Sequence, residues 1–595
     1  MLSTPPRDAL RFGGAWLTLN ALPFVPALVT ALPLSPYFPL CVEVLVLVTG
    51  LAYAGGTRGE GVARAMGVVG MLLLVAYEVY DAVVYEAFRR SGILYEDLQF
   101  VDNLTYLAFD LGSARLAGAA LGGLLAVGAL VEGVRRCVGV VVRAGRHGGC
   151  RAALLAVHLV AWPLVTVVGP QLQWGTPNLT YQTTSDQVRI RTVATKALAN
   201  ARASLRLDAL LDSLGTAPVD STYHAYDALT LERRPSIYLF AVESYGSILD
   251  RDPALRGPYR RVLRRTEDTL RADGWHMASA RLDAPVRGGR SWLAIASLLT
   301  GVRVDRQLVY NRFQSDPDDT PHLVRLLDRQ GYRTVALQPY TYPRPGLPVR
   351  NLYDFDVTLY RDDLRYEGPR YGLANAPDQY SLHFAHHTEL APSPDPFFLF
   401  FETVSSHALW NYGLPPYLPD WRQFNTAGEG GSPKAQLRRR GGPPTRFLPD
   451  SITAPRIFDQ STPRRYLRHI AYDLRVLRDY LAEKAPDGSL VLILGDHQPP
   501  LLDTQSSATP LHVLSTDPAL VDHVRRYGLT DGLLRTDRTP TLRQEGLYSL
   551  LVRLLVAHDR GAARGEDGPF RRAAADTTAL PPYRPEGVSP SLLVR

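Results

Sequence analysis

Residues 489–497 read SLVLILGDH, a short apolar run that ends in Gly495, Asp496 and His497. A run of this kind is typical of a strand buried on both faces, as in the parallel sheet of an α/β protein. In such sheets, ligands bind beyond the carboxyl ends of the strands. The aspartate and the histidine that follow this run are therefore candidates for binding or catalysis.

Three further runs of the same kind lie between residues 235 and 534, separated by amphipathic stretches: SIYLFAVES at 236–244, YRTVALQPY at 332–340 and PFFLFFETVSSH at 396–407. Buried strands that alternate with helices predict a doubly wound α/β sheet. The first run passes directly into Glu243, and the third leads through a short turn to His407. We therefore expect these side chains at the same edge of the sheet as Asp496 and His497.

Carboxylate oxygens and imidazole nitrogens at one sheet edge indicate a metal site. Glu243, Asp496 and His497 offer a mixed oxygen and nitrogen ligand set, which suits Zn²⁺ or Mn²⁺ better than Ca²⁺. Polar residues also close many strands without any function, so the Asp–His pair alone would be a weak signal. Together with Glu243 it predicts one bound divalent ion, with Mn²⁺ or Zn²⁺ favoured and Mg²⁺ as a further candidate.

A candidate nucleophile follows a glycine-rich turn. The segment RGGRSWLAIASLLTG, residues 287–301, predicts an apolar helix with Ser291 in its first turn and Gly301 at its end. Free N–H groups and the helix dipole favour a phosphate or sulfate anion at that helix end. Ser291 could also be only the N-cap. Beside a metal site we expect it to be the nucleophile, with Arg290 stabilising negative charge on the transferred group.

The first 170 residues are far more apolar than the rest and predict a membrane domain. Five stretches approach the roughly 20 residues that cross a bilayer; they lie at about 12–34, 36–54, 62–85, 112–133 and 152–169. A cleaved signal peptide is the alternative for the first. Arginines precede the first span and lie in the loops after the second and fourth, and positive loops stay in the cytoplasm. This predicts a multi-pass protein of the inner or plasma membrane, with a cytoplasmic N-terminus and an extracytoplasmic catalytic domain.

Three further features of the first 170 residues bear on function: acidic residues in the predicted spans, a cluster of arginines, and the cysteines. Glu43, Glu78 and Asp81 fall within or near the predicted spans, where they are either functional or close to the membrane interface, and we favour the interface. The net charge of +7 does not predict a nucleic-acid partner, because a cluster of arginines at 135–151 accounts for much of it. All three cysteines lie before residue 151, so none is available in the catalytic domain as a ligand, nucleophile or disulfide partner.

A chain of 595 residues is too long for one core. We expect a transmembrane domain at 1–170, a juxtamembrane linker at 171–234, a catalytic domain at 235–534, and a C-terminal helix and tail at 535–595. Within the catalytic domain, residues 411–462 are rich in glycine, proline and arginine. They predict an insertion loop, with a solvated excursion favoured over a basic lid.

These motifs resemble the alkaline phosphatase and sulfatase superfamily, and within it the membrane phosphoglycerol transferases of the lipoteichoic acid synthase type. The likeness covers roughly residues 235–534 and extends to the five-span anchor. It implies that Glu243, Asp496 and His497 bind the metal and that Ser291 is both the nucleophile and a fourth ligand. His407 is similar to the substrate-contacting histidine of that family.

Two departures from the family patterns limit the chemistry. Sulfatases carry a cysteine that becomes formylglycine, followed by proline two residues later and arginine four residues later. This chain has Ser291, Leu293 and Ile295 at those positions, so formylglycine chemistry is not expected. The transferases most often carry threonine where this chain has Ser291, a change that keeps the hydroxyl group.

The resemblance implies a membrane-anchored transferase that moves a phosphoglycerol-like group, through a serine-linked intermediate, from a membrane lipid to an extracytoplasmic glycan or lipid acceptor. A phosphate or sulfate ester hydrolase is the first alternative and differs only in using water as the acceptor. A catalytically silent membrane protein that binds envelope polymers is the second. His383, His386 and His387 could form a second metal site, but a solvated helix face is favoured. The sequence leaves the oligomeric state open.

Overall fold

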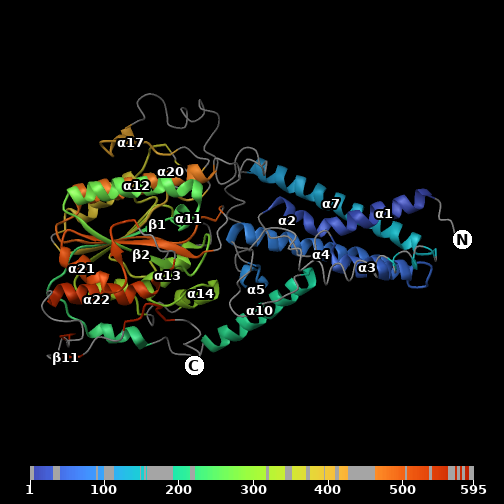
Figure 1. The fold of residues 1–595 in the computed structure, drawn as a ribbon, viewed down its shortest axis with the longest axis horizontal. Coiled ribbons are helices and arrows are strands. Elements are labelled where there is room, and N and C mark those ends of the chain that lie inside the picture. Colours follow the sequence, from blue (N-terminus) through green and yellow to red (C-terminus); the bar gives the residue numbers. More distant parts are fainter. Residues whose placement is uncertain are drawn as a thin grey trace. The chain divides into compact units, whose positions relative to one another are not determined.

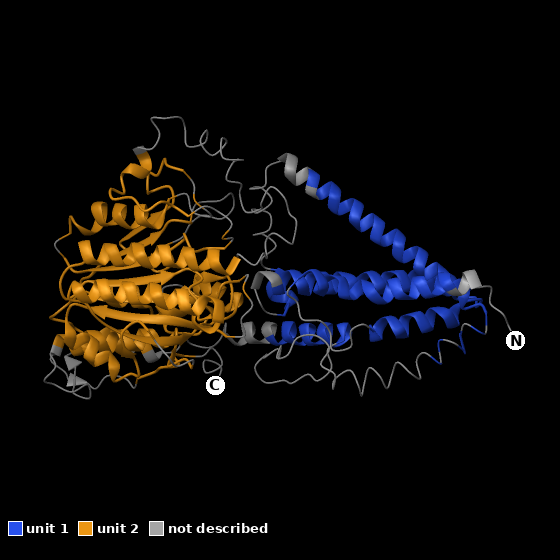
Figure 2. Cartoon of the chain, turned by 45° about the horizontal axis from the view of Figure 1, so that its top comes forward, with its two compact units in different colours: residues 1–208 blue, residues 209–595 orange. Residues whose placement is uncertain are grey.

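The computed structural model describes most of the chain outside a few segments. The described residues are 6–30, 40–88, 91–98, 113–147, 192–214, 221–315, 321–341, 351–369, 376–393, 395–408, 414–426, 462–500, 506–534 and 539–560, with isolated residues or pairs at 149, 151–152, 154, 156, 371, 410, 502, 570–571 and 577–578, and the short stretch 583–588. The chain divides into two compact units, Met1–Asp208 and Ala209–Arg595 (Figure 2).

The first unit is entirely helical in its described part. Its helices are α1 (Pro6–Ala21), η1 (Leu22–Phe24), α2 (Val25–Val29), α3 (Val42–Ala54), α4 (Glu60–Phe88), α5 (Leu94–Asp97), α7 (Ser113–Ala144) and α10 (Val193–Leu214). Leu19, Val48, Met71 and Val138, from four of these helices, share one buried apolar cluster. Many other apolar side chains of the unit are exposed, as expected for helices that face lipid.

Two described segments are long and apolar enough to cross a membrane, Leu10–Val29 and Glu60–Tyr85. They coincide with the first and third predicted spans and indicate a membrane-anchored chain. The second predicted span contains α3, which has 13 residues, and the fourth lies within α7. The fifth, at 152–169, lies almost entirely outside the described residues. The count of five spans and the topology derived from it therefore stay predictions.

Glu43, Glu78 and Asp81 all contact α10. Lys196 Nζ lies 2.9 Å from Glu78 Oε1 and 3.4 Å from Asp81 Oδ2, and the backbone N–H of Ala194 donates to Glu43 Oε1 at 2.7 Å. Glu78 and Asp81 are almost fully buried. Because a buried carboxylate is stable only with a partner, this ion cluster accounts for their presence within an apolar helix.

The second unit is built on a nine-stranded sheet in the order β4-β3-β5-β1-β6-β7-β2-β8, with β9 also paired to β2. The strands are β1 (Ile237–Val242), β2 (His276–Asp283), β3 (Arg333–Gln338), β4 (Val357–Tyr360), β5 (Phe397–Glu402), β6 (Leu490–Gly495), β7 (Ala508–Ser515), β8 (Thr530–Asp531) and β9 (Leu542–Arg543). β4, β3, β5, β1 and β6 are parallel to one another. The four runs quoted from the sequence are four of these five strands, which confirms the predicted α/β sheet, whereas β7 is antiparallel to both of its neighbours.

Helices cover both faces of this sheet (Figure 1). Because side chains alternate along a strand, Ile237, Leu239 and Ala241 of β1 enter one apolar cluster, while Tyr238 and Phe240 enter the other. The first cluster packs against α13 (Ser291–Thr300), α14 (Gln307–Ser315), α15 (Leu323–Arg329), α21 (Pro518–Arg525) and α22 (Gly546–Arg560). The second packs against α11 (Ile248–Arg251), α12 (Pro253–Ala272), α16 (Asp378–Ala385) and α20 (Thr462–Lys484).

The smaller elements complete the second unit. They are η4 (Ser221–Ala228), η5 (His386–Leu390), α17 (Gln423–Thr426), β10 (Phe570–Arg571) and β11 (Thr577–Thr578). Leu547 and Val556 of α22 belong to the same apolar cluster as β1, so the helix expected after residue 534 is part of the core of the α/β unit. Most of the predicted 411–462 insertion lies outside the described residues. The boundaries between the four predicted regions remain predictions.

Candidate active site

Pairing of the three central strands brings the predicted residues together. β1 lies between β5 and β6, with Ala241 paired to Glu402 and Val242 paired to Gly495. The residues that follow, Glu243 and Asp496, therefore emerge at one edge of the sheet. A Cβ on Gly495 would collide with the backbone of Tyr245, which explains the glycine before the Asp–His pair.

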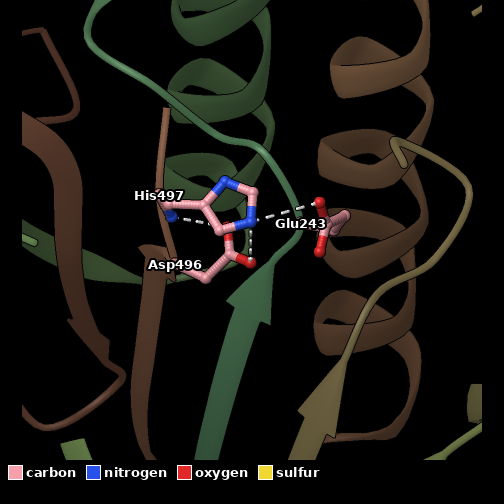
Figure 3. Close-up of side chains that lie close together, drawn as sticks. All are labelled: Glu243, Asp496 and His497. Atoms are coloured by element: carbon pink, nitrogen blue, oxygen red, sulfur yellow. Dashed lines mark hydrogen bonds and ion pairs between the residues drawn. The ribbon is translucent and has the colours of Figure 1, made fainter. Parts of the chain in front are cut away.

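Glu243, Asp496 and His497 form one compact group (Figure 3). Ligand atoms of the three side chains all lie within 4.8 Å of one another, and no other group of this kind is found among the described residues. His497 Nε2 lies 3.3 Å from Asp496 Oδ2 and 3.6 Å from Glu243 Oε1. His497 Nδ1 lies 2.8 Å from the carbonyl oxygen of Gln498, so the proton sits on Nδ1 and Nε2 faces the carboxylates with its lone pair.

Ser291 lies against this group. It is the first residue of α13, after Arg290 and before a helix that ends at Gly301, as the sequence predicts. Its hydroxyl donates to Glu243 Oε2 at 2.9 Å and lies 3.2 Å from His497 Nε2. The N-cap position is held by Arg290 and not by Ser291, so the alternative in which Ser291 only caps the helix is wrong.

The backbone is strained on both sides of the site. Ser244 and Arg290 have φ values of 59° and 64°, in the left-handed region that non-glycine residues rarely adopt. Ser244 is held there by Asp496 Oδ1, which accepts its N–H at 2.8 Å, and its hydroxyl donates to Glu243 Oε1 at 2.7 Å. These contacts fix the orientation of Glu243.

His407 and Arg290 lie near the group. Both influence the ionisation of His497 electrostatically. The Arg290 side chain is buried. The Nδ1 atom of His407 contacts the carbonyl oxygen of Ala408, which leaves Nε2 as the nitrogen able to meet a substrate. Their predicted roles in catalysis stay predictions.

The charges of the site fit a divalent cation. Burial, together with repulsion from Glu243 and Glu402, raises the pKa of Asp496 well above its usual range. Burial lowers the pKa of His497, which is therefore neutral. Asp496 Oδ2 is buried and has no hydrogen-bond donor among the residues that the structure describes. A cation would satisfy this orphaned oxygen and remove the repulsion between the carboxylates.

Glu402 is a site residue that the sequence analysis did not single out. It ends β5 and is 1% exposed. Tyr340, just after β3, donates to its Oε2 at 2.7 Å, and its carboxyl group also bonds to the side chain of Ser291. The sequence signal for Glu402 was its position at the end of the apolar run PFFLFFE, just as Glu243 follows its own strand. Ser291 thus lies between two buried carboxyl groups.

Replacing Glu402 with Gln is expected to change the pH dependence of stability in the metal-free protein. Burial and repulsion from Glu243 raise the pKa of Glu402 to about 8. The folded state therefore keeps a proton that the unfolded state has lost, and wild type loses stability steadily as the pH rises from about 5 to 8. Glutamine cannot titrate, so the Tm of Glu402→Gln in EDTA should rise relative to wild type over this interval. If the Tm of wild type and of Glu402→Gln changed with pH in parallel, Glu402 would not be the group with the raised pKa.

Comparisons with known proteins agree with the motif analysis. Residues 287–522 match the family model described as Sulfatase. No curated protein matches the chain. Matching solved structures include the lipoteichoic acid synthase LtaP of Listeria monocytogenes, with 13% identity and a TM-score of 0.32 over 49% of this chain and 70% of that one. They also include the phosphoethanolamine transferase EptA of Neisseria meningitidis, with 11% identity and a TM-score of 0.44 over 90% of this chain and 95% of that one. A third is the phosphoglycerol transferase GacH of Streptococcus pyogenes, with 11% identity and a TM-score of 0.33 over 58% of this chain and 78% of that one.

The matched segment begins at the turn before Ser291 and includes Asp496 and His497. Glu243 precedes it in the sequence and joins the group through the pairing of β1 with β6. Residues 287–522 therefore form a sulfatase-family domain, which supports the assignment of the chain as an enzyme.

Proposed function

We propose that this chain is a membrane-anchored, metal-dependent transferase that moves a phosphoglycerol-like group from a membrane lipid to an extracytoplasmic glycan or lipid acceptor. One observation carries the proposal: the Ser291 hydroxyl lies against side chains that could bind a metal ion. Ser291 Oγ is 2.9 Å from Glu243 Oε2 and 3.2 Å from His497 Nε2. The sulfatase-family match and the two apolar helices support it.

The site would hold one divalent ion, Mn²⁺ or Zn²⁺ in preference to Mg²⁺. The ligands would be Glu243, Asp496, His497 and the Ser291 oxygen. The bound ion supplies positive charge beside the serine oxygen and the phosphoryl oxygens of the substrate. Arg290 and the free N–H groups at the start of α13 would stabilise the remaining negative charge on the transferred group.

In the first step, Ser291 Oγ forms a bond to phosphorus while the bond from phosphorus to the lipid alcohol oxygen breaks. The serine proton passes to Glu243 Oε2, which already accepts it in a hydrogen bond. His407 gives the lipid alcohol its proton. In the second step, the acceptor hydroxyl attacks phosphorus and gives its proton to His407, while Ser291 Oγ leaves and recovers its own.

A hydrolase would use the same site and the same serine-linked intermediate, with water in place of the acceptor alcohol. Full-length protein in detergent micelles, given Mn²⁺ and phosphatidylglycerol labelled in its glycerol head group, separates the two. Transfer places the label on an added alcohol or glycan acceptor, whereas hydrolysis releases labelled glycerol phosphate only. The absence of both products, together with a metal-free protein, would favour the silent, polymer-binding alternative.

A further inference from the structure

Two buried aspartates meet beneath the segment that joins β5 to His407. Asp378 begins α16 and Asp473 lies in the middle of α20, and both side chains are 0% exposed. Their carboxyl groups bond to each other. Two carboxyl groups can share a hydrogen bond only if one of them carries a proton.

Asp378 is the acceptor of this pair. Its Oδ1 accepts the backbone N–H of Val404 at 2.9 Å, and its Oδ2 accepts the N–H of Ser405 at 2.8 Å. Both oxygens thus bind backbone donors, as a carboxylate does at low cost. Asp378 therefore fixes the backbone of residues 404–405.

Asp473 is the residue that carries the proton. Its Oδ2 accepts the hydroxyl of Thr403 at 3.1 Å, while its Oδ1 has no donor among the described residues. A proton on Asp473 Oδ1 lets this oxygen donate a hydrogen bond to Asp378, so that it has a partner. Burial and then the charge of Asp378 raise the pKa of Asp473 well above its usual range.

The same segment holds both backbone groups of Glu243. The N–H of Glu243 donates to Thr403 Oγ1 at 3.1 Å, and the carbonyl oxygen of Glu243 accepts the hydroxyl of Ser406 at 2.7 Å. Thr403 thus accepts from Glu243 and donates to Asp473. A continuous set of hydrogen bonds links the aspartate pair to the first candidate metal ligand.

We propose that Asp378 and Asp473 are positioning residues that act as one unit, Asp378 as a carboxylate and Asp473 as a carboxylic acid, to hold Glu243 and the segment bearing His407 in place. This inference rests on the proposed function, because it assigns the pair to the metal site of that reaction. Neither residue touches the metal ligands themselves.

The same substitution at the two positions gives a matched test. In Asp473→Asn, the amide N–H replaces the acid proton toward Asp378 and the amide oxygen still accepts from Thr403. In Asp378→Asn, an NH₂ group must face the N–H of Val404 or Ser405, and one acceptor is lost. Asp479→Asn, at the surface of the same helix α20, where Asp479 pairs with Arg478, is the control.

The readouts are the affinity of full-length protein for Mn²⁺ by titration calorimetry, and kcat and KM on labelled phosphatidylglycerol. Asp473→Asn and the control should match wild type within about twofold. Asp378→Asn should bind Mn²⁺ roughly 10–100-fold more weakly, as when the support of a ligand is lost, and should lose kcat with little change in KM. Thr403→Val, which removes the hydroxyl between Asp473 and Glu243, should weaken Mn²⁺ binding in the same way.

The pH dependence of stability tests the proton assigned to Asp473. The titratable groups facing the pair are the two aspartates, Tyr472 beside them, and His469, whose Nδ1 lies 2.6 Å from the carbonyl oxygen of Ser405. As the pH rises from 5 to 8, the Tm of wild type should fall relative to Asp473→Asn, because wild type retains, on Asp473, one more proton that the unfolded state has lost.

Equal losses in Asp378→Asn and Asp473→Asn, or unchanged Mn²⁺ affinity in Asp378→Asn with normal folding, would overturn the inference. An inactive wild type that nevertheless binds Mn²⁺ would count against the proposed reaction instead. In that case the calorimetric comparison still decides whether the pair positions Glu243.

Discussion

Replacing Ser291 with Ala should reduce turnover of the labelled lipid by roughly 10³-fold or more, as when a covalent nucleophile is removed. The metal content should stay near that of wild type, because Glu243, Asp496 and His497 remain as ligands. The substitution removes only a half-buried hydroxyl, so the Tm should fall by no more than the loss of one hydrogen bond to a charged group would cause. Activity assays and metal analysis on the same preparation check both parts.

Ser291→Thr is the matched control for this experiment. Threonine keeps a hydroxyl at the first position of α13 and should retain measurable turnover, whereas Ala and Val should not. Trapping with labelled lipid should place the label on Ser291 in wild type and on no residue in Ser291→Ala. Retained turnover in the alanine variant would remove Ser291 as the nucleophile while leaving the metal site untouched.

Removal of the metal or of one metal ligand should reduce turnover about as much as Ser291→Ala does. Treatment with EDTA should abolish turnover, and Mn²⁺ or Zn²⁺ should restore it in wild type but not in His497→Ala. A metal that binds only the folded state stabilises it by about 2.7 kcal/mol at 100 times Kd. We therefore expect Mn²⁺ to raise the Tm of wild type and to leave the Tm of His497→Ala unchanged. A Tm shift in the variant equal to that of wild type would place the ion elsewhere.

The stabilisation by metal should grow with pH. The pKa values of Asp496 and Glu402 are raised in the metal-free protein, chiefly by burial. Their protonated forms are favoured by folding, so metal-free protein loses stability as the pH rises above about 4 toward 8. A bound cation favours the charged carboxylates and offsets this loss. The Tm difference between protein with Mn²⁺ and protein with EDTA should therefore widen from pH 5 to pH 8.

Histidines outside the site show where sequence patterns were insufficient. His383, expected on a solvated helix face, is buried and stacks on Trp421 with ring centroids 6.3 Å apart. His386 Nδ1 lies 3.0 Å from the hydroxyl of Tyr480 on α20. The expectation of a solvated face was wrong for His383, because spacing along one helix says nothing about which distant helix packs over it.

The sequence by itself determined the central strands and the edge at which the chemistry lies. Short apolar runs with no polar face can be stable only when both faces are covered, and parallel strands bring their carboxyl ends to one edge. Glu243, Asp496 and His497 could therefore be grouped without coordinates. The glycine-rich turn before an apolar helix likewise placed Ser291 at a helix N-terminus.

Only the tertiary structure decided which side chains support those ligands. Glu402 follows an apolar run and, in the sequence, differs little from any polar residue that closes a strand. Asp473 occurs in an amphipathic helix among charged residues, where an aspartate is usually solvated. Glu402 became buried beside Tyr340 and beside Ser291 of α13. Asp473 became buried where α16 and α20, from distant parts of the chain, pack on the other face of the sheet. Hydrophobic periodicity fixes which face of an element is buried, but the partners of a buried polar group depend on contacts between elements far apart in sequence.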